Sequence, residues 1–286
     1  MMPQKDATQA QARAIIVVPC YNEAKRLDQP KFLNYTHHHP NINFIFVNDG
    51  SRDDTRRVLE EMATLRPDRV QVIHLAKNSG KAEAVRQGVL HALEKKCRYI
   101  GYWDADLSTP LETIDTFVHI LERHPVHAVI GARVKLLGRT IERHKSRHYL
   151  GRIFATLASM ILKLPVYDTQ CGAKLFRHTA LVHQIFSIPF VVNWAFDIEI
   201  IARMKLLTDG RKGSKAITPI IEHPLDQWIH HDGSKVNPMD FCKAPIELLK
   251  LFAILYLPGI SYLYRKKYFS TNGPTHLSPK NEKEMP

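Results

Sequence analysis

The chain has 286 residues, 44% of them hydrophobic, so it can bury a sizeable core, and a wholly disordered protein is excluded. Its formal net charge of +12 indicates an acidic partner, such as nucleic acid, an anionic membrane or a phosphate-bearing substrate, unless the basic surface is merely solvated. The four cysteines (Cys20, Cys97, Cys171 and Cys242) lie far apart without a CxxC pair, which indicates free thiols in a reducing compartment rather than a zinc site or a disulfide framework.

Residues 1–13 are polar, lack the apolar segment of a signal peptide and are expected to be flexible. Short apolar runs then alternate with helical patterns. The runs are residues 14–20, 43–49, 70–75, 99–103 and 127–131, and the helical patterns are residues 53–65, 82–93 and 111–121. Continuous apolar runs are typical of strands buried on both faces. Strands that alternate with helices predict an α/β fold with a mainly parallel sheet.

The chain becomes basic after residue 132, with six Arg or Lys residues in the segment 133–148. Residues 151–164 predict an amphipathic helix with Ile153, Leu157, Ile161 and Leu164 on one stripe. A second helix is predicted over residues 195–207, and a late strand over residues 216–221.

Three of the predicted strands end in polar clusters, namely residues 19–23 (PCYNE), 48–51 (NDGS) and 104–106 (DAD). Ligands of open parallel sheets bind outside the carboxyl ends of the strands, so the three clusters predict one shared site. Asp104 and Asp106 are spaced to hold a divalent cation against a diphosphate, although such pairs also occur in turns and helix caps.

Two further segments suit a phosphate-bearing nucleoside. Asp49 can bind a ribose or a base edge, or it can simply belong to a turn before a helix. Residues 77–82 (KNSGKA) combine two ammonium groups with a helix start, which suits phosphate. Their spacing is not that of a P-loop, so an ATPase is not supported.

The first half of the chain resembles glycosyltransferase family 2 with the GT-A fold. The matching segments are, in order, residues 17–23 (VVPCYNE), 47–51 (VNDGS), 78–81 (NSGK) and 104–110 (DADLSTP). Three later segments are similar to dolichyl-phosphate β-glucosyltransferases and their bacterial polyprenyl-phosphate relatives: residues 168–176 (DTQCGAKLF), 194–199 (WAFDIE) and 233–236 (GSKV). The resemblance covers about residues 14–257, and the order of the seven motifs is far more specific than any one of them.

The resemblance implies a nucleotide-sugar pocket. It would be lined by Pro19, Tyr21, Glu23 and Asp49, with Lys81 near the nucleotide or the diphosphate. Asp104 and Asp106 would bind Mg²⁺ or Mn²⁺, with Asp106 as the main ligand. The implied domains are a GT-A domain over residues 14–236, amphipathic membrane-interface helices over residues 237–269 and a flexible tail over residues 270–286.

The implied reaction is the inverting transfer of a hexose, with glucose favoured, from a UDP-sugar to a polyprenyl phosphate of the dolichyl or undecaprenyl type. A phosphomonoester has a second pKa near 6, so this acceptor is largely deprotonated at neutral pH and needs positioning and charge neutralisation more than a base. The candidates for neutralisation are Arg133, Arg139, Arg143 and Arg147, unless they form a solvated face, and Lys174 and Lys235 could also touch phosphate. Asp168 and Asp197 are the candidates for a base or an orienting carboxylate, with Asp197 slightly favoured.

Residues 153–164 and 248–264 are apolar and flanked by basic residues, which is typical of helices in a membrane interface. They could instead pack into the core or a dimer interface. No apolar run reaches the roughly 20 residues of a spanning helix, so we expect peripheral attachment at the cytoplasmic face of an anionic membrane. Self-association is possible.

Three rival functions remain. A GT-A enzyme acting on a glycan or a small-molecule hydroxyl would need a true base. A nucleic-acid-binding protein is disfavoured, because the sequence has no interleaved aromatic and basic platform. An inactive nucleotide-sugar-binding relative is disfavoured, because the pair Asp104 and Asp106 is intact.

Overall fold

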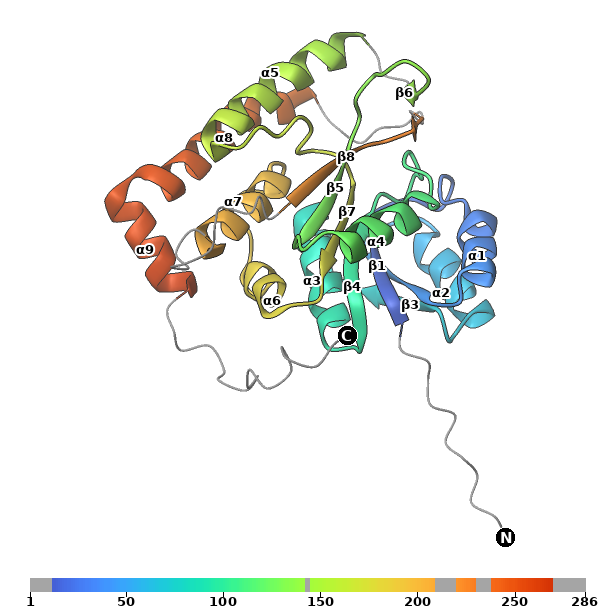
Figure 1. Cartoon of the computed structure of the whole chain (residues 1–286). Helices are drawn as coiled ribbons and strands as arrows, with labels where there is room; N and C mark the ends of the chain where they lie inside the picture. Colours follow the sequence, from blue (N-terminus) through green and yellow to red (C-terminus); the bar gives the residue numbers. More distant parts are fainter. Residues whose placement is uncertain (1–11, 142–144, 209–219, 230–237, 270–286) are drawn as a thin grey trace.

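A seven-stranded sheet forms the centre of the computed structural model, which describes residues 12–141, 145–208, 220–229 and 238–269. The strands lie in the order β3-β2-β1-β4-β7-β5-β8 (Figure 1). Their bounds are β1 Ala12–Cys20, β2 Ile42–Asn48, β3 Val70–His74, β4 Cys97–Trp103, β5 Ala128–Ala132, β7 Ala173–Arg177 and β8 Ile220–Pro224. A short parallel pair, β6 (Thr140–Ile141) and β9 (Gln227–Trp228), lies apart from this sheet.

The predicted α/β fold with a mainly parallel sheet is confirmed. Strand β1 pairs in parallel with β2 and β4, β2 with β3, and β5 with β8. The exception is β7, which lies antiparallel between β4 and β5. We did not predict β7 as a strand, because Lys174 and Arg177 interrupt its apolar pattern. Strand β8 shares only residues 220 and 221 with the late strand expected at residues 216–221, and residues 209–219 lie outside the described part of the chain.

Helices cover both faces of the sheet. Their bounds are α1 Gln29–His38, α2 Thr55–Leu65, α3 Lys81–Leu93, α4 Thr113–Arg123, α5 Lys145–Leu162, α6 Ala180–Phe186, α7 Phe196–Thr208, α8 Pro238–Tyr256 and α9 Pro258–Phe269. Alternate residues of β1 enter opposite cores. Ile15 and Val17 pack with the buried residues of α3, α5, α6, α7 and α8, whereas Ile16 and Val18 pack with those of α1, α2 and α4. Burial on both faces explains why this strand is apolar throughout.

The apolar stretch predicted over residues 248–264 is two helices rather than one. Pro258 cannot continue the hydrogen bonds of α8, and α9 departs at 83°. Within the described residues no single helix is long and apolar enough to cross a membrane, while α8 and α9 as a bent pair meet that measure of length and composition. Figure 1 shows α5, α8 and α9 together on one side of the molecule, away from α1 and α2.

The domain boundaries stay a prediction. Strand β1 begins at Ala12, two residues before the expected start of the GT-A domain. Residues 1–11 and 270–286, which include most of the expected flexible ends, lie outside the described residues.

Candidate active site

The carboxyl ends of β1, β2 and β4 open into a cavity of about 370 Å³. Its lining residues come from all three polar clusters, from the segment 78–84 around the start of α3, and from Arg26 and Trp194. They are Pro19, Cys20, Tyr21, Glu23, Arg26, Asp49, Asn78, Gly80, Lys81, Ala84, Asp104, Ala105, Asp106 and Trp194. The structure therefore brings together every residue that we expected around the nucleotide and the metal. The reason is topological, because the carboxyl ends of adjacent parallel strands meet at one edge of the sheet.

Side chains tie the loops after β1 and β2 to each other. The N–H of Asn22 donates to the Ser51 hydroxyl at 2.9 Å, and the Asn22 side chain accepts the N–H of Arg52 at 2.8 Å. Asn22 has a φ of 49°, a left-handed conformation that asparagine tolerates better than most residues. These contacts fix the segment that carries Tyr21 and Glu23 into the cavity.

Asp49 holds the turn that leads into α3. Its carboxylate accepts the N–H of Ser79 at 2.7 Å and that of Gly80 at 2.8 Å. The neighbouring Gly50 has a φ of 61°, and a Cβ there would overlap the backbone of Lys77. Asp49 thus lies in the cavity wall as expected, and in this structure it also fixes the loop before Lys81.

Lys81 lies at the start of α3 and contacts Asp104, one of the two carboxylates expected to bind the metal. Its Nζ donates to Oδ1 of Asp104 at 2.5 Å. Loss of water around the ammonium would lower the pKa of Lys81, but the carboxylates of Asp104 and Asp197 outweigh this effect and raise it. The ammonium is therefore held in its charged form, as contact with a diphosphate requires.

Asp106 contacts Arg26, which we did not predict in the site. Nη2 of Arg26 donates to Oδ2 of Asp106 at 3.3 Å, and the N–H of Ser108 donates to Oδ1 at 3.0 Å. Arg26 lies three residues after Glu23, to which it also forms an ion pair at 3.7 Å. The sequence offered one signal for Arg26, namely a basic residue that closely follows the PCYNE cluster. Only the structure shows that it faces the carboxylate of Asp106.

Gly172 links Asp104 to the segment 168–176 (DTQCGAKLF). Its carbonyl accepts the N–H of Asp104 at 3.0 Å. A Cβ at position 172 would overlap the carboxylate of Asp104. The antiparallel strand β7, which begins at the next residue, therefore places a glycine where the side chain of Asp104 must lie.

Asp168 is bound to Arg133. Nε and Nη2 of Arg133 donate to the two oxygens of Asp168 at 2.6 and 2.8 Å, and the Arg133 N–H donates at 3.1 Å. Burial alone would lower the pKa of Arg133, but Asp168 raises it above its ordinary value, and Asp104 adds to the effect. Asp168 is buried and does not line the cavity, so its geometry suits the orientation of Arg133 rather than proton transfer.

Asp197 and Lys174 form a buried ion pair, and neither residue lines the cavity. Nζ of Lys174 donates to Oδ1 of Asp197 at 2.5 Å and to the carbonyl of Cys171 at 2.6 Å, and the Tyr102 hydroxyl donates to the same Asp197 oxygen. Burial, together with the charge of Asp197, raises the pKa of Tyr102 well above its usual range. Lys174 is 0% exposed, so the contact with phosphate that we considered for it does not fit this geometry.

The remaining basic candidates are only partly described. Arg139 donates to the carbonyl of Pro224 and forms an ion pair with Asp226 at 3.0 Å. Arg143, Lys235 and the side chain of Arg147 lie outside the described residues.

Comparison with known proteins identifies the family. Residues 15–183 match the family model described as Glycosyl transferase family 2. The chain belongs to glycosyltransferase family 2. Among its relatives, dolichyl-phosphate beta-glucosyltransferase from Dictyostelium discoideum is 30% identical over 86% of this chain and 75% of the relative. The enzyme of the same name from Homo sapiens is 32% identical over 78% of this chain and 69% of the relative. The family resemblance predicted from the motifs is confirmed.

Solved structures show the same fold. Glucosyl-3-phosphoglycerate synthase from Mycobacterium tuberculosis, in complex with Mn²⁺, UDP-glucose and phosphoglyceric acid, superposes with a TM-score of 0.60 at 16% identity, over 85% of this chain and 80% of that one. A second complex of that enzyme, with UDP, gives a TM-score of 0.59 over 85% of this chain and 81% of that one. The predicted GT-A fold is confirmed.

The residues of this family 2 site fit a divalent cation. Among the described residues there is no cluster of three or more His, Cys, Asp or Glu side chains that could hold a metal by itself. Two carboxylates, from Asp104 and Asp106, nevertheless face one cavity, and Mg²⁺ or Mn²⁺ takes one or two carboxylates when substrate phosphates supply the other oxygens. The bare Cα of Gly172, which leaves room for the Asp104 carboxylate, supports this fit.

Proposed function

We propose that this family 2 enzyme transfers glucose from UDP-glucose to a polyprenyl phosphate, with inversion at the sugar and with Mg²⁺ or Mn²⁺ bound. The observation that carries the proposal is the convergence of Asp49, Lys81, Asp104 and Asp106 on one cavity. The dolichyl-phosphate glucosyltransferases at about 30% identity support the choice of sugar and acceptor.

On the donor side, Pro19, Tyr21 and Glu23 contact the nucleoside, and Asp49 fixes the loop below it. Asp106 and Asp104 would hold the cation, which neutralises charge on the departing diphosphate. Lys81 and Arg26, which lie against these carboxylates, supply further positive charge to the same diphosphate.

On the acceptor side, the two candidate bases are already engaged. Asp168 is bound at two points by Arg133, and Asp197 is buried against Lys174 and Tyr102. Both therefore act as orienting groups in our proposal. This favours an acceptor that is deprotonated before it binds, and a phosphomonoester meets that condition at neutral pH. Arg133, oriented by Asp168, and Arg143 neutralise the acceptor phosphate.

A hydroxyl acceptor is the second candidate, because sheet and cavity alone also fit that chemistry. It requires a base, and Asp197 is then the carboxylate whose loss should be most damaging.

The experiment is a panel of UDP- and GDP-sugars with Mg²⁺ or Mn²⁺, in which nucleotide release is measured with and without polyprenyl phosphate. We expect release from UDP-glucose that depends on polyprenyl phosphate and stops with EDTA. Release that follows a sugar or alcohol acceptor instead would overturn the proposal.

The metal assignment has its own test. Asp106→Ala should abolish metal-dependent transfer while leaving the protein folded, because Asp106 is partly exposed at the cavity wall. Near-normal transfer by this variant would exclude Asp106 as the main ligand.

We further propose that α5, α8 and α9 rest on an anionic membrane at its cytoplasmic face. Helices α5 and α8 bury one side, α9 buries Tyr264, and all three expose large apolar side chains. The exposed ones are Ile153, Leu157 and Met160 of α5, Ile246, Leu249 and Phe252 of α8, and Ile260, Tyr262 and Leu263 of α9. Arg265 and Lys266 are exposed beside them, which suits anionic headgroups.

The apolar stripe predicted over residues 151–164 is only partly exposed, and its last member, Leu164, lies beyond the end of α5. Ile153 is 61% exposed, whereas Ile161 and Leu164 pack against the core.

Flotation with vesicles of phosphatidylcholine and phosphatidylserine tests the membrane proposal. We expect binding that weakens with salt and is lost in Leu249→Asp/Phe252→Asp, and no binding by the wild-type protein would contradict it. A dimer through this face would appear instead as a doubled mass in light scattering.

A further inference from the structure

Trp194 reaches the donor cavity from a loop, residues 187–195, that joins α6 to α7. Its indole packs edge-on against Phe154 of α5, with ring centroids 4.8 Å apart. Among the described residues, no strand pairs with this loop. Its backbone is held by side chains from three helices, α3, α7 and α8.

Glu247 of α8 fixes the end of the loop nearest the cavity. Its carboxylate accepts the N–H groups of Asn193 at 3.2 Å, Trp194 at 3.0 Å and Ala195 at 2.8 Å. These three residues directly precede α7, where backbone N–H groups have no partner within the helix and the helix dipole is positive. A carboxylate is therefore well suited to this place, and it comes from a different helix.

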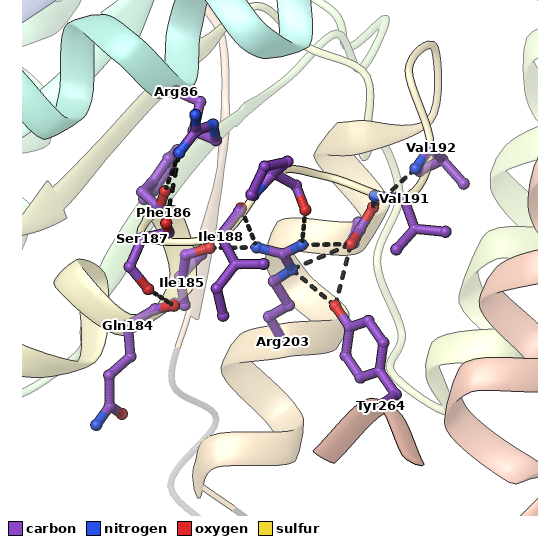
Figure 2. Close-up of polar contacts among 12 residues, drawn as sticks. Arg86, Gln184, Ile185, Phe186, Ser187, Ile188, Val191, Val192, Arg203 and Tyr264 are labelled. Carbon is purple, nitrogen blue, oxygen red and sulfur yellow. Dashed lines mark hydrogen bonds and ion pairs between the residues drawn. The ribbon is translucent and has the colours of Figure 1, made fainter. Parts of the chain in front are cut away.

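Glu199 and Arg203, both on α7, fix the start of the loop, and Figure 2 shows Arg203 between Ile188 and Tyr264. Oε2 of Glu199 accepts the N–H groups of Val191 and Val192 at 2.8 and 3.0 Å. The guanidinium of Arg203 pairs with Glu199 at 2.7 Å and also donates to three backbone carbonyls. These belong to Ile185, Ile188 and Pro189.

Tyr264 brings α9 into the same network. Its hydroxyl accepts from Nε of Arg203 at 2.9 Å and donates to Oε1 of Glu199 at 3.1 Å. Burial, and then the charge of Glu199, raises the pKa of Tyr264, so the hydroxyl stays a donor at physiological pH. Arg86 of α3, the helix that begins with Lys81, donates to the carbonyls of Phe186 and Ser187 at the other end of the network (Figure 2).

We propose that Glu247 and Tyr264 are positioning residues through which α8 and α9 hold Trp194 in the donor cavity. Glu247 binds the backbone N–H of Trp194 directly, and Tyr264 contacts Glu199 and Arg203, which hold the start of the loop. The inference rests on the proposed function in one respect, namely that the ligand of the cavity is UDP-glucose. The same helices carry the face that we propose for the membrane. In this proposal the position of α8 and α9 therefore also determines where Trp194 lies in the donor cavity.

Hydrogen exchange on the full-length protein tests the contacts themselves. In Glu247→Ala the amides of residues 193–195 lose their acceptor, and we expect their exchange to accelerate about tenfold or more, while Val191 and Val192, held by Glu199, keep their rates. Tyr264→Phe should accelerate Val191 and Val192 instead. Glu247→Gln keeps one acceptor oxygen and should give an intermediate rate at residues 193–195. The matched control is Glu61→Ala on α2, an exposed carboxylate whose ion pair with Arg57 contributes little.

Calorimetric binding of UDP-glucose with Mn²⁺ tests the consequence. We expect Glu247→Ala to weaken binding about tenfold and Glu247→Gln to restore part of it, with KM for the donor raised more than kcat is lowered. Unchanged exchange at residues 193–195, or faster exchange with unchanged UDP-glucose affinity, would overturn the inference. If the wild-type protein binds UDP-glucose but transfers to no polyprenyl phosphate, the acceptor assignment fails and these two measurements still decide the role of Glu247. If it binds no UDP-glucose, the proposed donor is wrong, and the positioning of Trp194 is judged by the exchange pattern.

Discussion

Gly172 lies against the carboxylate of Asp104, and the Gly172 carbonyl accepts the N–H of Asp104 at 3.0 Å. The two residues are far apart in the sequence and meet because β7 inserts antiparallel beside β4. The carboxylate that we propose as a metal ligand therefore depends on the segment 168–176, whose sequence resembles that of dolichyl-phosphate β-glucosyltransferases.

Replacement of Gly172 tests this dependence. In Gly172→Ala the new methyl group displaces the Asp104 carboxylate, and we expect metal-dependent transfer to fall at least about tenfold and stability to drop by about 1–3 kcal/mol. Urea unfolding and a Mn²⁺ titration of activity measure the two effects. Gly151→Ala in α5 is the control, since a Cβ there meets nothing and alanine favours a helix. Equal activity in the two variants would show that Asp104 does not need this contact.

The buried pair of Lys174 and Asp197 is expected to matter for stability. Lys174→Met leaves the carboxylate of Asp197 in the core without its cation, which destabilises a protein by about 3–5 kcal/mol. Asp197→Asn in the same chain removes the stranded charge and keeps an acceptor for Tyr102, so the double variant should unfold at higher urea than Lys174→Met alone. A double variant that is as unstable as the sum of both changes would contradict the ion pair.

Asp168 is expected to act through Arg133. Asp168→Asn cannot hold the guanidinium at two points, so we expect KM for polyprenyl phosphate to rise about tenfold while UDP-glucose affinity stays within about twofold. Arg133→Met should have the same effect, and the double variant should be little worse than either single one. Additive losses would instead indicate that Asp168 has a separate catalytic role.

The pH dependence of transfer is expected to follow the acceptor. The polyprenyl phosphate loses its second proton near pH 6, so kcat/KM should rise through about pH 6 and then stay level. Lys81 causes no fall up to pH 9, because its pKa is raised above the ordinary 10.5 and its ammonium stays charged below that value. A phosphonate acceptor with a higher second pKa should move the rising limb upward. If the rising limb of the kcat/KM profile stays at the same pH with the phosphonate, the titrating group is a carboxylate of the protein rather than the acceptor.

The sequence by itself determined the fold class and the family, and it predicted which residues line the cavity that we propose for the donor. Five apolar runs with intervening helical patterns allow little besides a parallel sheet, and in such a sheet polar residues after adjacent strands must meet at one edge. Asp49, Lys81, Asp104 and Asp106 were therefore predictable from their places after strands or at a helix start.

Only the tertiary structure decided how the other charged residues are used. The second half of the chain carries several charged residues within its motifs, among them Asp168, Lys174 and Asp197. Whether such a side chain lines a cavity or forms a buried ion pair depends on what packs against it. Burial removed Lys174 from solvent and gave it Asp197 as a partner, and Arg133 took both oxygens of Asp168. Contacts such as Glu247 with Trp194 join residues more than 50 positions apart, and no local pattern encodes them. A charge buried in a low dielectric must find a partner, and three-dimensional packing alone selects which one.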